Sequence, residues 1–270
     1  MSNVSISTNK LTIGYTDNRK SNIENRKIVQ RDLTFSLHEG EMVCMLGPNG
    51  CGKSTLLRTL AGLQPALSGE YNLYSVSPKD GLSSVSERSE RSKHIALVLT
   101  ERLSMDNTTV HDVVAMGRYP YTSFLGGLTQ QDEAIITEAL QQVGFSALPF
   151  REGTGVGSSM FNAHSDGEKQ CILIAKALAQ QTPIILLDEP TAHLDLPHRI
   201  LVLRLLRRLA HEQGKTVLIS THELDLALAL SDRILLMTPG KGVQLDTPDR
   251  LRQNNAFTDA FGMDIFNPLG

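Results

Sequence analysis

Short apolar runs and longer segments with helical spacing alternate along the chain, separated by polar or glycine-rich turns. Apolar runs bounded by turn residues predict strands, because strands are short and their buried side chains follow one another closely. The expected strands cover residues 11–15, 33–37, 42–46, 69–76, 94–99, 183–190, 215–221, 233–237 and 242–246. The run 42–46 is apolar throughout, which indicates a strand buried on both faces. Polar stretches at 16–27 and 83–93 indicate exposed loops.

Apolar residues with helical spacing occupy most of the segments between these strands. This spacing is found over 54–63, directly after a glycine-rich turn, and again over 197–213 and 223–231. From about 108 to 180 it is the dominant pattern. Thr109, followed three residues later by Asp112, and Thr129 are helix-start signals, and Gly144 is a stop signal. Alternating strands and helices predict an α/β fold with a mostly parallel sheet covered on both faces. The long helical stretch predicts a lobe inserted into that core.

Composition limits the class of protein. The 270 residues are 40% hydrophobic, which suits one large domain with a core of its own. A net charge of −3 leaves no basic footprint, so we expect no nucleic-acid partner. The three cysteines lack paired spacing, and the odd count fits free thiols in a reducing compartment. The polar N-terminus and the lack of an apolar run near about 18 residues lead us to expect that any work at a membrane is done from its surface, through a partner.

A glycine-rich segment after the buried strand carries the clearest chemistry. Residues 47–55, GPNGCGKST, fit the phosphate-loop pattern G-x-x-x-x-G-K-[ST], with a strand before and a helix after. Glycines let backbone N–H groups converge on phosphate oxygens, and the helix start adds its positive dipole. We expect Lys53 to reach the β- and γ-phosphates of a nucleotide and the Ser54 hydroxyl to bind Mg²⁺. The nucleotide-binding residues expected here are Gly47, Pro48, Asn49, Gly50, Cys51, Gly52, Lys53, Ser54 and Thr55.

Cys51 lies inside this loop and allows two interpretations. A redox switch would need a thiol with a lowered pKa, and nothing in the sequence indicates one. We therefore expect an exposed loop position that tolerates many side chains.

Polar residues follow two other predicted strands. Asp188 and Glu189 come directly after the apolar run 184–187, and His222 follows the run VLIST at 217–221. In an open α/β sheet, ligands bind at the carboxyl ends of the strands. Beside a phosphate loop, Asp188 is expected to assist Mg²⁺, and Glu189 to polarise the attacking water as the general base. His222 is expected to contact the γ-phosphate or to hold the water and Glu189 in line, although a lone histidine is more often structural.

The helix expected from residue 165 onward begins with Ser165-Asp166-Gly167-Glu168. Ser165 and Glu168 form a capping-box pattern, and Asp166 places a favourable negative charge in the first turn. Read alone, this is an ordinary helix start. A helix start also presents backbone N–H groups to an anion, so a phosphate-binding role remains open.

Taken in order, these motifs resemble those of the ATP-binding subunits of ABC transporters, over about residues 12–251. GPNGCGKST resembles the Walker A segment, HSDGEKQ the signature, IILLDEP the Walker B segment, TAHLD the D-loop and STHE the switch-histidine segment. The resemblance implies a P-loop NTPase core with a mostly parallel sheet, an antiparallel β subdomain and a helical lobe at about 101–180, all in a single domain, 1–270. It also implies ATP hydrolysis, with ATP and Mg²⁺ as cofactors.

By the same resemblance, two chains pair as a homodimer around two ATP molecules, and each ATP lies between Walker A of one chain and the signature of the other. The Ser165 hydroxyl and the Gly167 amide would then meet the γ-phosphate of ATP bound to the partner chain. Asp195 resembles the D-loop residue that crosses the dimer interface. Tyr15 resembles the aromatic residue that stacks on adenine, and a core tyrosine at a strand edge is the alternative.

Three positions depart from the family pattern. His164 stands where the signature usually begins with Leu, and Asp166 replaces its first glycine. A carboxylate near a triphosphate is unfavourable, so we expect Asp166 to cap the helix instead. The usual glutamine of the Q-loop falls on Thr100, whose hydroxyl has a shorter reach, and the neighbouring Glu101 is a possible substitute.

Residues 114–124, VAMGRYPYTSF, are similar to a stretch in cassettes that import iron-siderophore, haem or cobalamin. The resemblance implies a peripheral subunit on the cytoplasmic face of the cell membrane. Its partners would be an integral-membrane permease subunit and, indirectly, a substrate-binding protein. An ABC-type ATPase of translation or DNA repair is the alternative, but the chain shows one cassette and no sustained heptad pattern. A P-loop kinase would share only the first motif.

Overall fold

The structure is a computed structural model that describes residues 3–16, 26–73, 90–100, 105–122, 127–145, 159–192 and 194–263. Most of the two polar loops predicted at 16–27 and 83–93 lies outside these ranges, as do the last residues of the strand predicted at 69–76 and Glu101. Within the described ranges, every helix is too short or too polar to cross a lipid bilayer.

A six-stranded sheet forms the centre of the fold, in the order β5-β6-β7-β3-β8-β9. Its strands are β3 (Met42–Leu46), β5 (Ile95–Val98), β6 (Ile184–Asp188), β7 (Thr216–Ser220), β8 (Arg233–Thr238) and β9 (Gly242–Asp246). Neighbouring strands run parallel except β8 and β9, so the predicted, mostly parallel sheet is confirmed. Every residue of β3, β6 and β7 is buried, which explains why their sequences are continuously apolar.

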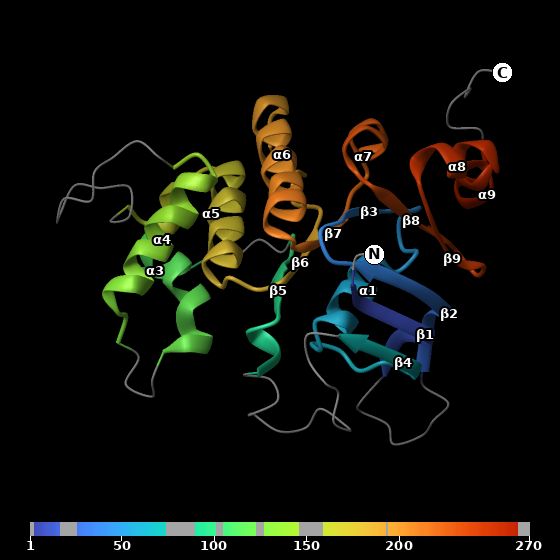
Figure 1. Ribbon diagram of the computed structural model, residues 1–270, viewed down its shortest axis with the longest axis horizontal. Coiled ribbons are helices and arrows are strands. Elements are labelled where there is room, and N and C mark those ends of the chain that lie inside the picture. The colour runs from blue at the N-terminus through green and yellow to red at the C-terminus, as the bar shows by residue number, and fades with distance from the viewer. Residues whose placement is uncertain are drawn as a thin grey trace.

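A second, antiparallel sheet has the order β2-β1-β4 and lies beside the first (Figure 1). Its strands are β1 (Val4–Thr16), β2 (Arg26–His38) and β4 (Ser68–Leu73). The apolar pattern predicts only 11–15 and 33–37 of β1 and β2. The pairing explains this, because it shifts register at several points and Lys10 and Asp32 adopt positive φ. Each shift interrupts the alternation of inward and outward side chains by which a strand is recognised.

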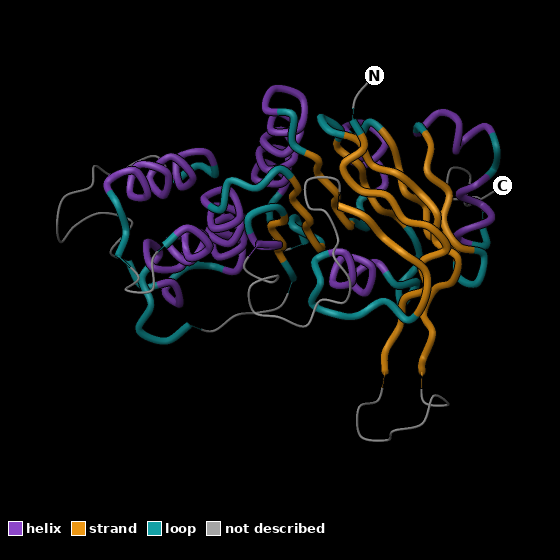
Figure 2. The backbone as a smooth tube through the Cα atoms, turned by 60° about the horizontal axis from the view of Figure 1, so that its bottom comes forward, coloured by secondary structure: helices purple, strands orange, loops and turns teal. Residues whose placement is uncertain are grey.

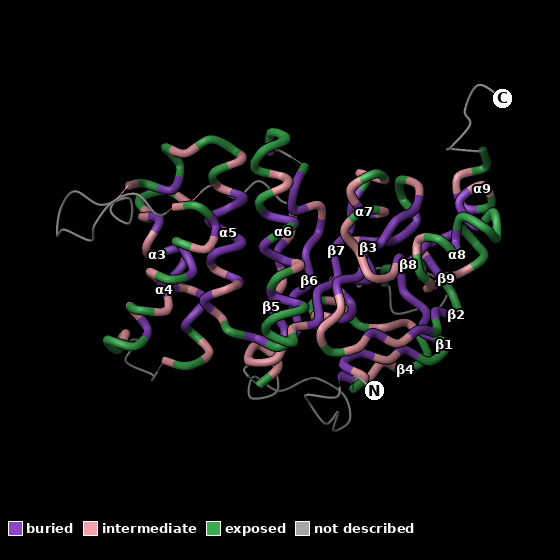
Figure 3. Tube along the Cα trace, turned by 45° about the horizontal axis from the view of Figure 1, so that its top comes forward, coloured by how far each residue is buried: buried purple, intermediate pink, exposed green. Residues whose placement is uncertain are grey.

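Helices cover both faces of the central sheet, so that two apolar cores form. Helix α1 (Lys53–Leu60) lies between the two sheets, where Leu56 and Leu57 are fully buried. On the other face, α6 (Leu196–Gln213) and α7 (Leu224–Leu230) pack against a larger core, which also includes residues of α8 (Pro248–Gln253) and α9 (Ala256–Phe261). Figure 3 shows the central strands buried along their length.

The helical segments between β5 and β6 gather at one end of the molecule (Figures 1 and 2). They are α3 (Val110–Ala115), η2 (Met116–Tyr121), α4 (Gln130–Gln142), η4 (Phe161–Ala163) and α5 (Asp166–Ala179). The start signals predicted at Thr109 and Thr129 are confirmed, since each side chain accepts a hydrogen bond from the amide three residues on. The boundaries 101–180 given to this lobe, and the single domain 1–270, stay predictions.

Candidate functional site

The phosphate-loop segment connects the end of β3 to the start of α1. Gly50 and Gly52 have φ of 77° and 106°, a region that L-residues avoid. A Cβ on Gly52 would also lie 2.7 Å from Cγ1 of Val29. Gly52 is the N-cap of α1 and supplies no side-chain cap, so the first turn keeps N–H groups for an anion. The buried Lys53 ammonium donates to the carbonyl oxygens of Gly47 (2.7 Å) and Pro48 (3.4 Å) and so lies within the loop.

The expectation that Cys51 occupies an exposed position is wrong, because its side chain is only 2% exposed. It lies against Gly47, where a Cβ would come within 2.8 Å of the Cys51 sulfur. Burial raises the pKa of the Cys51 thiol, although the nearby Lys53 ammonium opposes that shift. The thiol is therefore part of the packing that shapes the loop. Cys44 and Cys171 are also free and buried.

Asp188 is the last residue of β6 and Glu189 comes directly after it, at the same edge of the sheet as the phosphate loop, because β6, β7 and β3 are consecutive and parallel. Asp188 is buried, and its Oδ1 accepts a hydrogen bond from the Ser220 hydroxyl at 2.5 Å. The parallel register pairs Asp188 with Ser220, the last residue of β7. Strand order thus brings these two side chains together.

Glu189 stands in a left-handed backbone conformation, with φ of 47°. Such a conformation costs a non-glycine residue about 1–3 kcal/mol and persists only when its surroundings hold it. Its carboxylate contacts the imidazole Nε2 of His222, which follows the neighbouring strand β7. Both side chains stay partly exposed, so the pair faces outward from the end of the sheet. The structure therefore brings Glu189 and His222 together, as the sequence predicts.

Two hydroxyl residues at this edge were not assigned these contacts from the sequence. Thr100, just beyond β5, donates from Oγ1 to the backbone carbonyl oxygen of Asp188 at 2.7 Å. Ser220 is fully buried and also accepts a hydrogen bond from the backbone N–H of Glu189 at 3.0 Å. The only signal in the sequence is that each hydroxyl lies at or just beyond a predicted strand end, and strand order is needed to see which ends meet.

Tyr15, in β1, lies next to Thr55, the last residue of the phosphate-loop segment. Its phenol oxygen is 2.9 Å from Oγ1 of Thr55, and the residue is 45% exposed. This exposure disagrees with a core tyrosine and leaves the ring accessible next to α1.

The predicted capping box at the start of α5 is present. The Ser165 hydroxyl accepts from the Glu168 amide (3.3 Å) and donates to the Glu168 carboxylate (2.8 Å), which also accepts from the Ser165 amide (2.9 Å). These hydrogen bonds, and to a smaller extent the nearby His164 imidazole, lower the pKa of the Glu168 carboxyl. Ser165 and Glu168, rather than Asp166, thus form the cap, and Asp166 is exposed in the first turn. Among the described residues, the side-chain hydrogen bonds of Ser165 go to Glu168, so this side chain is not bonded to the phosphate loop of the same chain.

Asp195 is the N-cap of α6. Its Oδ1 accepts from the backbone N–H of His198 at 3.1 Å and lies 2.5 Å from the imidazole Nδ1 of that residue. The hydrogen bond from the His198 amide, then that from its ring, lowers the pKa of the exposed Asp195 carboxyl. Asp195 therefore has a local structural role in the single chain.

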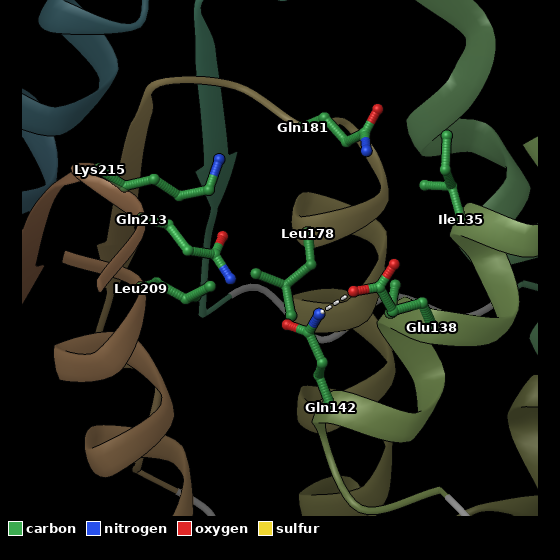
Figure 4. Close-up of a pocket in the computed structure, with 9 residues that line it drawn as sticks. Ile135, Glu138, Gln142, Leu178, Gln181, Leu209, Gln213 and Lys215 are labelled. Carbon is green, nitrogen blue, oxygen red and sulfur yellow. Dashed lines mark hydrogen bonds between the residues drawn. The ribbon is translucent and has the colours of Figure 1, made fainter. Parts of the chain in front are cut away.

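A groove of about 410 Å³ opens elsewhere, between α4 and α5 of the lobe and the end of α6 (Figure 4). Its lining residues are Ile135, Glu138, Ala139, Gln142, Leu178, Gln181, Leu209, Gln213 and Lys215. On the α4 side of the groove, Glu138 accepts a hydrogen bond from Gln142 one turn further along the same helix. None of the lining residues is a predicted site residue, so this groove is separate from the phosphate loop.

A phosphate loop between β3 and α1, and an acidic pair at the same edge of the sheet at the end of the parallel strand β6, define a P-loop nucleotide-hydrolysing class of protein. Residues 30–192 match the ABC transporter family. The chain is 35% identical over 260 residues to the iron(3+)-hydroxamate import ATP-binding protein FhuC of Bacillus subtilis, covering 92% of this chain and 87% of the relative. The chain therefore belongs to the ABC transporter ATP-binding family, and it is an ATP-binding cassette and an ATP hydrolase.

Two solved structures are similar to the whole fold. An inward-facing metal-chelate type ABC transporter matches with a TM-score of 0.76 and 27% identity, covering 96% of this chain and 90% of that chain. A dimeric ATP-binding cassette in a post-hydrolysis state with ADP and Pi matches with a TM-score of 0.73 and 25% identity, covering 90% and 98%. The predicted fold class is thus confirmed.

Proposed function

We propose that this chain is the ATP-hydrolysing subunit of an importer for a metal chelate, with an iron-siderophore as the first candidate and haem or cobalamin as the others. It works as a homodimer against an integral-membrane permease subunit on the cytoplasmic face of the cell membrane, and indirectly with a substrate-binding protein. One structural observation carries the ATPase chemistry. The phosphate loop follows β3 and the pair Asp188–Glu189 lies at the end of β6, and these two parallel strands flank β7 in the sheet. The metal-chelate assignment rests on the similarity to FhuC and to the metal-chelate type transporter.

The residues of the loop are suited to a nucleoside triphosphate with Mg²⁺. Lys53 lies within the loop, ready to exchange its carbonyl contacts for phosphate oxygens. Ser54 and Asp188 offer hard oxygen ligands, and Mg²⁺ is commonly held by one or two such groups together with substrate phosphates. Ser220 occupies one carboxylate oxygen of Asp188 and so orients the other. Bound Mg²⁺ would neutralise phosphate charge. The exposed ring of Tyr15 would stack on the adenine.

Glu189 is the proposed general base. Its carboxylate is partly exposed at the carboxyl end of β6 and can accept a proton from water. The His222 imidazole contacts it and holds its direction. Lys53 would stabilise the charge that develops on the transferred phosphoryl group.

Hydrolysis requires a second chain in this proposal. Ser165 and Gly167 belong to the lobe, and the side chain of Ser165 makes its hydrogen bonds to Glu168 rather than to the phosphate loop. The start of α5 retains the positive end of a helix dipole for a phosphate held by the partner chain. Asp195, exposed before α6, would lie at the same interface. Closure of the two chains would move the lobe and the permease subunit with it.

The decisive test is Glu189→Gln. ATP binding should persist while the steady-state rate falls about 10²-fold or more, which is the range of general-base catalysis. Glu138→Gln is the matched control, because it removes one exposed carboxylate of α4, bonded to Gln142, and should leave the rate unchanged. Normal turnover by Glu189→Gln would refute the assignment of the base.

Two further measurements separate the rival functions. The specific activity of the wild-type protein should fall as the chain is diluted below its dimerisation range, and full activity from a dilute monomer would contradict the trans site. Co-purification with a membrane subunit, rather than with ribosomes or DNA, supports transport. Transfer of phosphate to an acceptor would instead indicate a kinase.

A further inference from the structure

The peptide bond between Asp188 and Glu189 is held at both of its polar ends. Its N–H, which belongs to Glu189, donates to Oγ of Ser220 at 3.0 Å and to the Ser220 carbonyl oxygen at 3.1 Å. Its carbonyl oxygen, which belongs to Asp188, accepts from Oγ1 of Thr100 at 2.7 Å. The two partners come from opposite sides, because β5 and β7 flank β6 in the sheet. The plane of this peptide is therefore fixed by both neighbouring strands.

The fixed peptide constrains the backbone conformation of Glu189. Glu189 has φ of 47°, a left-handed conformation that a glutamate adopts only under constraint. Rotation of the peptide plane changes φ of Glu189 and so alters the backbone from which its side chain reaches His222. Hydrogen bonds to the carbonyl oxygen and to the N–H both oppose that rotation, because the peptide plane cannot rotate without breaking them.

The Thr100 side chain is committed to this contact. A threonine hydroxyl carries one proton, and here that proton goes to the Asp188 carbonyl at a short distance. A β-branched residue has few rotamers, so the hydroxyl is held in this direction at little entropic cost. Ser220 supports the other side, because its hydroxyl donates to Oδ1 of Asp188 while accepting from the Glu189 amide.

We propose that Thr100 is a positioning residue for ATP hydrolysis, which fixes the Asp188–Glu189 peptide and so aims the carboxylate of Glu189 at the attacking water. Thr100 acts through the backbone of the acidic pair, and its own hydroxyl need not touch the nucleotide or Mg²⁺. The inference rests on the proposed role of Glu189 as the general base.

The test compares three single-residue variants of the full chain with the wild-type protein. ATP affinity and kcat are measured separately for each. Thr100→Val keeps the shape of the side chain and removes the hydroxyl, so kcat should fall about tenfold while ATP affinity stays within about twofold. Thr100→Ser keeps the hydroxyl and should recover most of the rate. Thr182→Val is the matched control, because the Thr182 hydroxyl is buried and donates to the carbonyl of Ile184 (2.8 Å) at the opposite end of β6; it should leave kcat unchanged.

Each outcome decides between positioning and a merely structural role. Wild-type kcat in Thr100→Val, an equal loss in Thr100→Ser, or an equal loss in Thr182→Val would overturn the proposal, as would a parallel fall in ATP affinity. If Thr100→Val does not fold, Thr100→Ala is measured by the same criteria. Glu189→Gln is assayed alongside. Full activity there would refute the general base itself, whereas an inactive Glu189→Gln with a normal Thr100→Val would refute only the positioning role.

Discussion

A buried ion pair joins the parts of the helical lobe, and its removal gives a sharp prediction about stability. Nε of Arg118, in η2, donates to Oδ1 of Asp132, in α4, at 2.8 Å. Nη1 donates to the Ala179 carbonyl at the end of α5 (2.8 Å) and to Oε1 of Gln181 (3.2 Å), while the guanidinium stacks 4.3 Å from the ring centre of Tyr121. Arg118 and Asp132 are 6% and 7% exposed, so water can do little to solvate either charge when its partner is removed.

Arg118→Met keeps a long apolar side chain and removes the charge. Breaking a buried pair by deleting one partner costs about 3–5 kcal/mol, because the other charge stays buried without its counterion. Thr129 still donates its amide and hydroxyl to Oδ2 of Asp132, at 2.9 and 2.7 Å, so we expect the lower end, about 3 kcal/mol. At about 2–4 °C per kcal/mol for a large domain, Tm should fall by about 6–12 °C.

Urea unfolding followed by circular dichroism measures the loss, in a double-mutant cycle with Asp132→Asn. Arg208→Met, at an exposed position of α6, is the control and should change stability by less than about 0.5 kcal/mol. A loss below about 1 kcal/mol for Arg118→Met, or a coupling energy near zero, would show that the pair contributes little and would refute this reasoning.

Two further predictions concern nucleotide binding and acid stability. Lys53→Ala should weaken ATP binding at least about tenfold in a titration with labelled nucleotide, because the loop loses its only lysine and a charge-assisted contact; unchanged binding would remove the phosphate loop from the mechanism. The Thr129 hydroxyl and amide, then Arg118, lower the pKa of Asp132 to about 2. A lowered carboxyl pKa stabilises the fold above the unfolded value near 4 and loses that stabilisation as pH falls toward 2. Asp132→Asn should therefore flatten the dependence of unfolding free energy on pH between about 4 and 2, and an unchanged slope would contradict the assignment.

Some features of the fold follow from short-range sequence alone. A buried parallel strand must be apolar on both faces, so β3, β6 and β7 are visible as continuous apolar runs. Helix starts depend on residues three positions apart, and the boxes at Thr109 and Ser165 form as the sequence predicts. The long strands β1 and β2 were predicted only in part, because their alternation changes phase at register shifts that depend on the partner strand.

The candidate site likewise has features that local sequence predicts and features that depend on the order of the strands. The phosphate loop, the acidic pair Asp188–Glu189 and His222 can be predicted from local patterns, because glycines, charges and strand ends are local properties of the chain. The burial of Cys51 and the hydrogen bond from Thr100 to the carbonyl oxygen of Asp188 become visible only in the folded chain. These contacts join residues far apart in the chain, and they exist because the order β5-β6-β7-β3 sets particular strand ends side by side. Local patterns can identify the end of a strand, but they do not specify which other strand ends lie next to it.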